Sequence, residues 1–155
     1  MNVRADLVPA DPAWEPRVRE SFARQGAMAL LGATIEELAP GTCVVGAAYR
    51  PELSQQHGFF HAGVTGALAD SAGGYAALTL FPPDSDVLTV EFKINLLAPA
   101  HGETLRARGE VVRSGRTLTI CRVDVEVVRD GRATVCAVMQ QTLMRVARVR
   151  PPSTA

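Results

Sequence analysis

The sequence predicts an α+β fold in which one long helix lies across an antiparallel sheet. The helix is expected within the small-residue run 57–81, because Pro82 and Pro83 must end it. Three segments with an apolar period of two follow, and then a last strand whose two faces are both mostly apolar or uncharged; short turns separate these segments. Successive hairpins build antiparallel sheets, so these segments predict a sheet that only the long helix can cover.

Local periodicity and turn residues predict the other elements. Apolar residues recur at helical spacing in 11–32, which predicts one helix that stops at Gly32. A turn is expected at 37–42, and strands are expected at 43–50, 87–99, 103–113, 117–128 and 132–146. The apolar phase slips near Ile120 and Cys121, which is compatible with a β-bulge there.

Composition narrows the classes of function. The 155 residues include sixteen basic and sixteen acidic side chains, so the chain lacks the basic excess of nucleic-acid-binding proteins and we expect no such partner. No segment is apolar over the roughly 18 residues of a membrane span, and the first residues lack the apolar core of a signal peptide. Cys43, Cys121 and Cys136 lie far apart in apolar runs, which predicts buried free thiols and a cytoplasmic location.

One carboxylate, Asp70, lies in the otherwise uncharged run "HGFFHAGVTGALADSAGG". A buried carboxylate must be hydrogen-bonded or paired, and burial suits a general base or a nucleophile. The residues alone equally allow a structural role, in which Asp70 caps a second helix that starts at Ser71. Four glycines are expected to let the helix approach the sheet closely: Gly63, Gly66, Gly73 and Gly74.

The two histidines of this run are spaced like those of a zinc-protease helix. That motif needs a Glu after the first His, where this chain has Gly58, and no further ligand lies at metal-binding spacing. We therefore expect no metal site. His61 is expected to be a structural residue, hydrogen-bonded near the start of the helix, rather than an acid or base.

Three stretches together carry a family resemblance: "QQHGFFHAGVTGALADSAGGYAA", "LTVEFKINLLAPA" and "GEVVRSGRTLTICRVDV". Over about 31–144 the chain resembles the PaaI-like branch of the hotdog-fold acyl-CoA thioesterases. The pattern is His-x-Gly, an Asp nine residues after the His, and a later strand that ends in Pro. It implies a single hotdog domain, an antiparallel sheet wrapped around a long central helix. The domain would have an N-terminal helical segment 1–30, a core 31–146 and a tail 147–155.

The resemblance also implies an activity and its residues. The enzyme would hydrolyse the thioester of an acyl- or aryl-CoA to the free acid and CoA, with no cofactor beyond the CoA of the substrate. Asp70 would be the catalytic carboxylate, as nucleophile or as general base. The backbone N–H of Ala62 would polarise the thioester carbonyl. Gln55 would position the carbonyl or a water, and Thr89, from a neighbouring subunit, would orient the carboxylate.

Other positions complete the expected substrate site. His61 and Gly63 would contact the substrate beside Ala62, which stands where many relatives have Gly and whose methyl group could crowd the acyl sulfur. The nucleotide end of CoA would bind at Arg113, Ser114 and Arg116, because arginine suits phosphate. The alternative is that these are ordinary solvated strand charges. The aromatic candidates for an acyl pocket are equally candidates for the core: Phe59, Phe60, Tyr75 and Phe81.

The resemblance implies a homodimer with sheets joined edge to edge, and a dimer of dimers is common in the family. The residues support this, because the strands at 87–97 and 117–128 are long and would be hazardous as open edges. Two other functions stay open. One is a non-catalytic acyl-CoA-binding protein that uses the same pocket. The other is a hydratase, which we rank lower because those enzymes carry their Asp and His close together in a loop.

Overall fold

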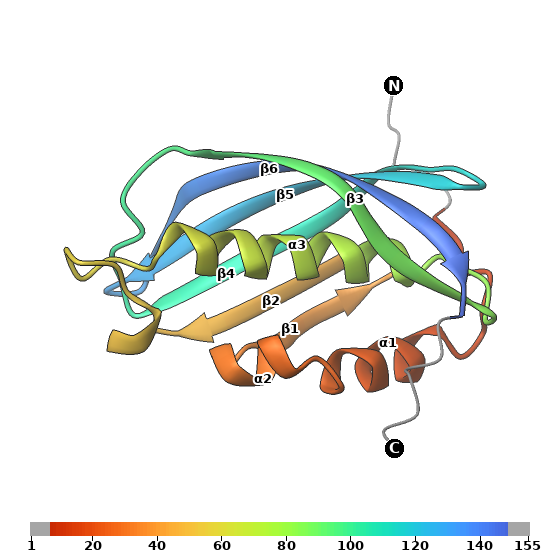
Figure 1. Cartoon of the computed structure of the whole chain (residues 1–155), viewed down its shortest axis with the longest axis horizontal. Helices are drawn as coiled ribbons and strands as arrows, with labels where there is room; N and C mark the ends of the chain where they lie inside the picture. The colour runs from red at the N-terminus through yellow and green to blue at the C-terminus, as the bar shows by residue number, and fades with distance from the viewer. Residues whose placement is uncertain (1–6, 149–155) are drawn as a thin grey trace, which may run out of the picture.

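The computed structural model describes residues 7–148, which form one six-stranded antiparallel sheet wrapped around the helix α3 (Ala62–Leu78) (Figure 1). This is the predicted hotdog fold. The strands are β1 (Thr34–Ala39), β2 (Thr42–Ala48), β3 (Ser85–Leu96), β4 (Thr104–Ser114), β5 (Leu118–Arg129) and β6 (Arg132–Ala147). Two short helices, α1 (Trp14–Ala23) and α2 (Gly26–Leu31), and a 3-10 turn at Pro51–Leu53 complete the fold. Most of the predicted tail lies outside the described residues.

The strand order is β1-β2-β4-β5-β6-β3, which corrects the predicted succession of four hairpins. β4, β5 and β6 form hairpins as predicted. β3 does not pair with β4; it crosses α3 and pairs with β6, with Thr89 opposite Leu143. The strand at 117–128 is not exposed as an edge, because β5 lies between β4 and β6. β3 is the free edge on that side of the sheet.

β1 is absent from the predicted elements, and the predicted turn at 37–42 covers its second half. The strand carries no alternation that could reveal it, because Glu36 and Glu37 are adjacent and a register shift falls between Ile35 and Glu37. Pairing with β2 holds this segment extended, and the turn narrows to Pro40 and Gly41, which has φ 75°. Tertiary pairing overrides the local pattern here.

The predicted helix over 11–32 is two helices with a break at Arg24 and Gln25. Gln25 has ψ 103°, an extended conformation, and Gly32 ends α2 with φ 66°, as predicted. Arg17 attaches α1 to the far end of α3. Its guanidinium donates to the carbonyl oxygen of Phe81 at 2.7 Å, and its Nε lies 2.8 Å from Oδ2 of the buried Asp11. The break at Gln25 and the contacts of Arg17 together place α1 beside Asp70.

α3 runs without interruption through Asp70, so the alternative in which Asp70 caps a second helix is wrong. Of the four helix glycines, only Gly73 makes a close approach to the sheet. A Cβ at Gly73 would overlap Gln141 of β6 and lie 3.2 Å from Val123 of β5. The sheet contributes its own glycine, because a Cβ at Gly109 of β4 would lie 2.5 Å from the carbonyl oxygen of Ala72.

The alternation of β5 is unbroken, which corrects the predicted position of the bulge. Thr119, Cys121 and Val123 are buried against α3, while Ile120 faces the outer side of the sheet. The extra residue is Val112 of β4, which lies between the partners of Cys121 and Ile120. The three cysteines are buried and free, as predicted. Within 7–148, no helix is long and apolar enough to cross a membrane.

Candidate active site

The first part of the site is the N-terminal end of α3. His61 is the N-cap residue, and its Nδ1 accepts a hydrogen bond of 2.8 Å from Gly63 N–H. The predicted structural role of His61 is confirmed, and the N–H of Gly63 is not available to a substrate. Ala62 is the first helical residue and is exposed. Its N–H has no partner within the described chain, because the first N–H groups of a helix lie beyond its own ladder.

Gln55 lies next to this helix end in a tight loop. Its N–H donates to the carbonyl oxygen of Phe59 at 2.9 Å, and its Oε1 accepts from His57 N–H. Gly58 has φ 80°, a left-handed conformation that favours glycine and closes the loop. Gln55 and Ala62 line one cavity of about 460 Å³, together with Phe59, Phe60, Thr65, Leu96, Leu97, Ala98, Pro99, Ala100 and Cys136.

The second part of the site is the carboxylate of Asp70, half-buried on α3. Thr89 Oγ1 donates to Asp70 Oδ1 at 2.7 Å. Gln141 Nε2 donates to the same Oδ1 and also to the backbone carbonyl of Asp70 at 3.1 Å. The resemblance implied that Asp70 would be oriented by Thr89 of a neighbouring subunit. Here Thr89 and Asp70 belong to one chain.

The sequence does not predict a role for Gln141. The available signal is a glutamine in an otherwise apolar strand face, between Met139 and Leu143, at a position where a polar side chain must find a buried partner. The residue it meets, Asp70, is 71 positions away. Only the pairing of β6 beneath α3 brings the two together.

A second cavity, of about 310 Å³, opens beside Asp70 between α1, α3 and β3. Its wall on the α1 side carries polar groups. Ser71 Oγ donates to Gln25 Oε1 at 3.3 Å, and the hydroxyls of Ser21 and Tyr75 are 3.3 Å apart. Gly74, one turn after Asp70, lines the cavity, and a Cβ there would meet nothing within 4 Å. This cavity is therefore the space that a group bound at Asp70 can enter.

The two parts are separated along one helix. Ala62 and Asp70 are eight residues apart, which is about 12 Å along the helix axis. They line different cavities. The structure thus brings Thr89 to Asp70 and Gln55 to Ala62, but it does not bring these two pairs together within one chain.

The aromatic candidates are divided among the cavities and the core. Phe59 and Phe60 line the cavity at Ala62, and Tyr75 lines the cavity at Asp70. Phe81 is buried and lines neither. Tyr75 packs edge-on against Phe22, and burial raises the pKa of its hydroxyl, so Tyr75 remains a neutral hydrogen-bonding group.

The candidate CoA residues lie at the exposed β4–β5 hairpin. Ser114 shares a row across the sheet with Thr89 but is three strands away, about 14 Å. Arg113 pairs with Ile120 and so faces the outer side of the sheet, opposite to α3. Two other arginines are engaged in ion pairs with β1. Arg106 lies beside Glu36, and Arg108 binds Glu37, whose pKa it lowers. Arg106 and Arg108 therefore act as strand charges paired with β1, and the role of Arg113, Ser114 and Arg116 stays a prediction.

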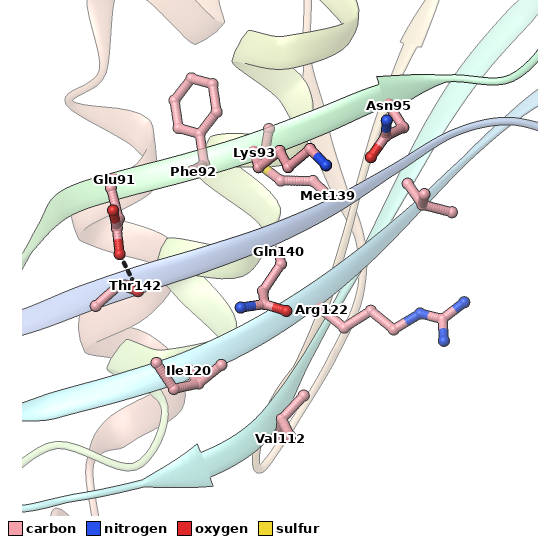
Figure 2. Close-up of a pocket in the computed structure, with 11 residues that line it drawn as sticks. Glu91, Phe92, Lys93, Asn95, Val112, Ile120, Arg122, Met139, Gln140 and Thr142 are labelled. Atoms are coloured by element: carbon pink, nitrogen blue, oxygen red, sulfur yellow. Dashed lines mark hydrogen bonds between the residues drawn. The ribbon is translucent and has the colours of Figure 1, made fainter.

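A groove of about 690 Å³ lies on the outer face of the sheet (Figure 2). Thr142 donates to Glu91 there at 3.2 Å, and Gln140, Arg122 and Ile120 lie on the same face. The sheet separates this groove from α3, so it is not part of the site at Asp70. Among residues 7–148, no three His, Cys, Asp or Glu side chains are grouped closely enough to hold a metal ion.

An antiparallel sheet wrapped around a long central helix defines the hotdog fold, and here that helix carries a hydrogen-bonded carboxylate. The chain belongs to the thioesterase superfamily, whose family model matches residues 57–136, just over half of the chain. That match includes the start of α3, Asp70 and Thr89.

Individual relatives agree with this assignment. A thioesterase family protein from Silicibacter pomeroyi is 47% identical, with a TM-score of 0.86 over 87% of this chain and 99% of its own. A provisionally named esterase of Saccharolobus solfataricus is 32% identical over 94 residues, 61% of this chain and 66% of the relative. A thioesterase from Haemophilus influenzae, 21% identical with a TM-score of 0.73 over 82% of this chain and 87% of its own, shares the fold. The chain spans about two thirds of the length of the Saccharolobus relative.

Proposed function

We propose that this protein is an acyl-CoA thioesterase of the PaaI-like branch, which hydrolyses an acyl- or aryl-CoA to the free acid and CoA. One observation carries the proposal. The Asp70 carboxylate is held by two hydrogen-bond donors at the wall of a cavity, in a chain of the thioesterase superfamily. A positioned carboxylate beside an open cavity can hydrolyse a thioester as general base or as nucleophile.

Two chemical routes use this carboxylate. As a nucleophile, Asp70 attacks the carbonyl carbon, the C–S bond breaks, CoA leaves as the thiolate, and water then hydrolyses the anhydride. As a general base, Asp70 takes a proton from the water that attacks the carbonyl carbon, the C–S bond then breaks, and CoA leaves as the thiolate, which takes up a proton. In both routes negative charge develops on the carbonyl oxygen, and the N–H of Ala62 at the positive end of α3, which has no partner among residues 7–148, would stabilise it.

Each active site would be built from two copies of the chain. A thioester carbonyl that contacts Ala62 N–H cannot also lie within about 3.5 Å of Asp70 in the same chain, because the two residues are about 12 Å apart. We therefore infer that one copy supplies Ala62 and Gln55, while a second copy supplies Asp70 and Thr89. The predicted homodimer gives two such sites.

The free edge of β3 supports this arrangement. Five large apolar side chains of β3 and the residue after it are 48–58% exposed: Leu88, Val90, Phe92, Leu96 and Leu97. An exposed apolar edge strand is a ready template for pairing with another chain. Thr89 and Leu96 lie near opposite ends of β3. Antiparallel pairing about a twofold axis near Phe92 would therefore place the Asp70 part of one copy beside the Ala62 part of the other.

We propose the remaining parts of the substrate site as follows. The cavity of about 310 Å³ would take the acyl group. CoA would be bound as part of the substrate, with its phosphates near Arg113, Ser114 and Arg116 on the exposed hairpin. A dimer of dimers and a cytoplasmic location stay predictions, and the three buried free thiols agree with a reducing compartment.

A mixed-dimer experiment tests the activity and the composite site together. First, the wild-type protein is assayed with a panel of acyl-CoAs, with Asp70→Asn expected to abolish turnover. Then Asp70→Asn is co-expressed with Ala62→Pro, which removes the Ala62 N–H. The mixed dimer should regain up to about half of the activity per dimer, because one of its two sites combines an intact Ala62 with an intact Asp70 from the other chain.

Each outcome is decisive. A mixed dimer without activity, from parents that fold and dimerise, would place each site within one chain. Hydrolysis of no acyl-CoA by the wild type would overturn the thioesterase proposal, and tight acyl-CoA binding without turnover would then favour a binding protein. Hydration of an enoyl-CoA would favour the hydratase alternative.

A further inference from the structure

We infer that Gln141 of β6 is a positioning residue, which fixes the rotamer of Asp70 so that one carboxylate oxygen, Oδ2, faces the substrate. The inference rests on the proposed function in the sense that Asp70 is the reacting carboxylate. Gln141 is fully buried, and its Nε2 is directed at three acceptors: both the backbone carbonyl and Oδ1 of Asp70, and Thr89 Oγ1 at 3.3 Å.

The orientation of the amide follows from its neighbours. Asp70 presents two oxygens that can only accept, so the Gln141 atom that faces them must be the NH₂ group. A flipped amide would direct Oε1 at a carboxylate and a carbonyl, which is repulsive. Thr89 donates to the same Oδ1. Both donors therefore engage one oxygen of the carboxylate, and Oδ2 is left for the substrate or a water.

Packing places Gln141 where it acts on Asp70. Its Oε1 lies where the Cβ of any residue other than glycine at position 73 would be. Gly73 therefore lets the glutamine lie flat against α3 and reach back one turn to Asp70. The same interaction ties the backbone of α3 to β6, so the carboxylate is held at both its main chain and its side chain.

Stability alone does not account for a glutamine at this position. Its Oε1 is buried and has no hydrogen-bond partner among the described residues. A buried polar atom without a partner destabilises the folded state, and an apolar side chain of similar shape would avoid that cost. The strand accommodates such residues on either side, because Met139 and Leu143 are buried on the same face. The benefit of the glutamine lies in what its NH₂ group does to Asp70.

The test compares Gln141→Met with Gln140→Met. The two variants make the same chemical change on adjacent residues, but Gln140 is exposed on the outer face of the sheet. For Gln141→Met we expect kcat to fall by about 10- to 100-fold, since a misplaced reacting group costs up to about 100-fold. KM should change by less than about threefold and the melting temperature should not fall, while Gln140→Met should match the wild type. Gln141→Leu is the substitute if the methionine variant does not fold.

A double variant and a crystal structure complete the experiment. Thr89→Val combined with Gln141→Met should lose less activity than the product of the two single losses, because both donors hold one oxygen. A Gln141→Met protein with wild-type kcat, or with a loss that follows a lower melting temperature, would overturn the inference. If the wild type hydrolyses no acyl-CoA, the proposed function fails separately. The crystal structure of Gln141→Met then decides, because an unmoved Asp70 side chain would contradict positioning.

Discussion

Thr89 Oγ1 lies 2.7 Å from Asp70 Oδ1 within one chain, although Thr89 is on the free edge strand and Asp70 is on the central helix. The bond joins the start of β3 to the middle of α3 at the wall of the cavity. The hydroxyl is well placed to orient the carboxylate. The chain that carries Asp70 therefore orients this carboxylate by itself, before a second copy pairs with its β3.

Replacing Thr89 by Val should lower kcat by about tenfold, the effect of losing one hydrogen bond to a charged group. Thr89→Ser keeps the hydroxyl and should retain most of the activity. Steady-state kinetics on the best acyl-CoA of the panel would measure both. Equal activity of the Val and Ser variants would show that the hydroxyl does not act on Asp70.

Ala62→Pro should lower kcat by about 100-fold or more while the protein stays folded. Proline is favoured at the first position of a helix, and His61 before it already has φ −64° and ψ 140°, which the residue before a proline prefers. The substitution thus removes the N–H with little other change. Circular dichroism and kinetics would check this result. Ala62→Gly, which keeps the N–H, is the matched control and should remain active.

Gly74→Val should narrow the range of acyl groups. The added side chain would enter the cavity beside Asp70, where a Cβ meets nothing within 4 Å. We expect kcat/KM to fall for bulky acyl-CoAs and to change least for acetyl-CoA. Gly66→Val adds the same atoms to the same helix at a position that lines neither cavity. It should leave the ratio of kcat/KM for bulky acyl-CoAs to kcat/KM for acetyl-CoA unchanged. An unchanged ratio in Gly74→Val would place the acyl group elsewhere.

Arg17→Met should reduce the free energy of unfolding by about 3 kcal/mol, because it leaves the buried Asp11 carboxylate without its ion pair. The loss of bonds to the last carbonyls of α3 and the following turn acts in the same direction. Urea unfolding would measure the change. Arg19→Met removes an exposed pair with Glu15 and should cost less than about 1 kcal/mol. Similar losses in the two variants would contradict the anchor role of Arg17.

The buried thiols should make the protein less stable at alkaline pH. Burial raises the pKa of Cys43 and of Cys121 from 9.0 to about 12. Between pH 9 and 12 the two thiols thus stay protonated in the native state, while the same thiols lose their protons in the unfolded chain. Their contribution to stability is complete below pH 9 and is lost as the pH rises towards 12. Urea unfolding between pH 7 and 10.5 should show this fall.

Alanine variants and alkylation check the cause. Cys43→Ala and Cys121→Ala should each flatten the alkaline fall in the free energy of unfolding. In the native protein at pH 8 both thiols should react slowly with iodoacetamide, because they are buried and protonated. Fast native labelling of either cysteine would contradict this account.

The sequence by itself determined the α+β class, the extent of the long helix and most of the strands, because hydrophobic period and proline positions act locally. It also identified Asp70 as an acid that must have a partner, because Asp70 lies in a small apolar run. The residues alone left its role open between catalysis and helix capping, and the family resemblance favoured catalysis. Local pattern could not reveal β1, whose adjacent glutamates hide its pairing, nor the break of the first helix at Gln25.

The family resemblance implied that Thr89 orients Asp70, but only the tertiary structure decided that the two meet within one chain and that Gln141 joins them. The pairing of β3 with β6 brings Thr89 and Gln141 to one carboxylate oxygen, and the helix rise separates that carboxylate from the Ala62 N–H. Hydrogen bonds between distant strands and distances along a rigid helix are properties of the folded chain. No sequence spacing reveals them, because the partners are chosen by the order of strands in the sheet.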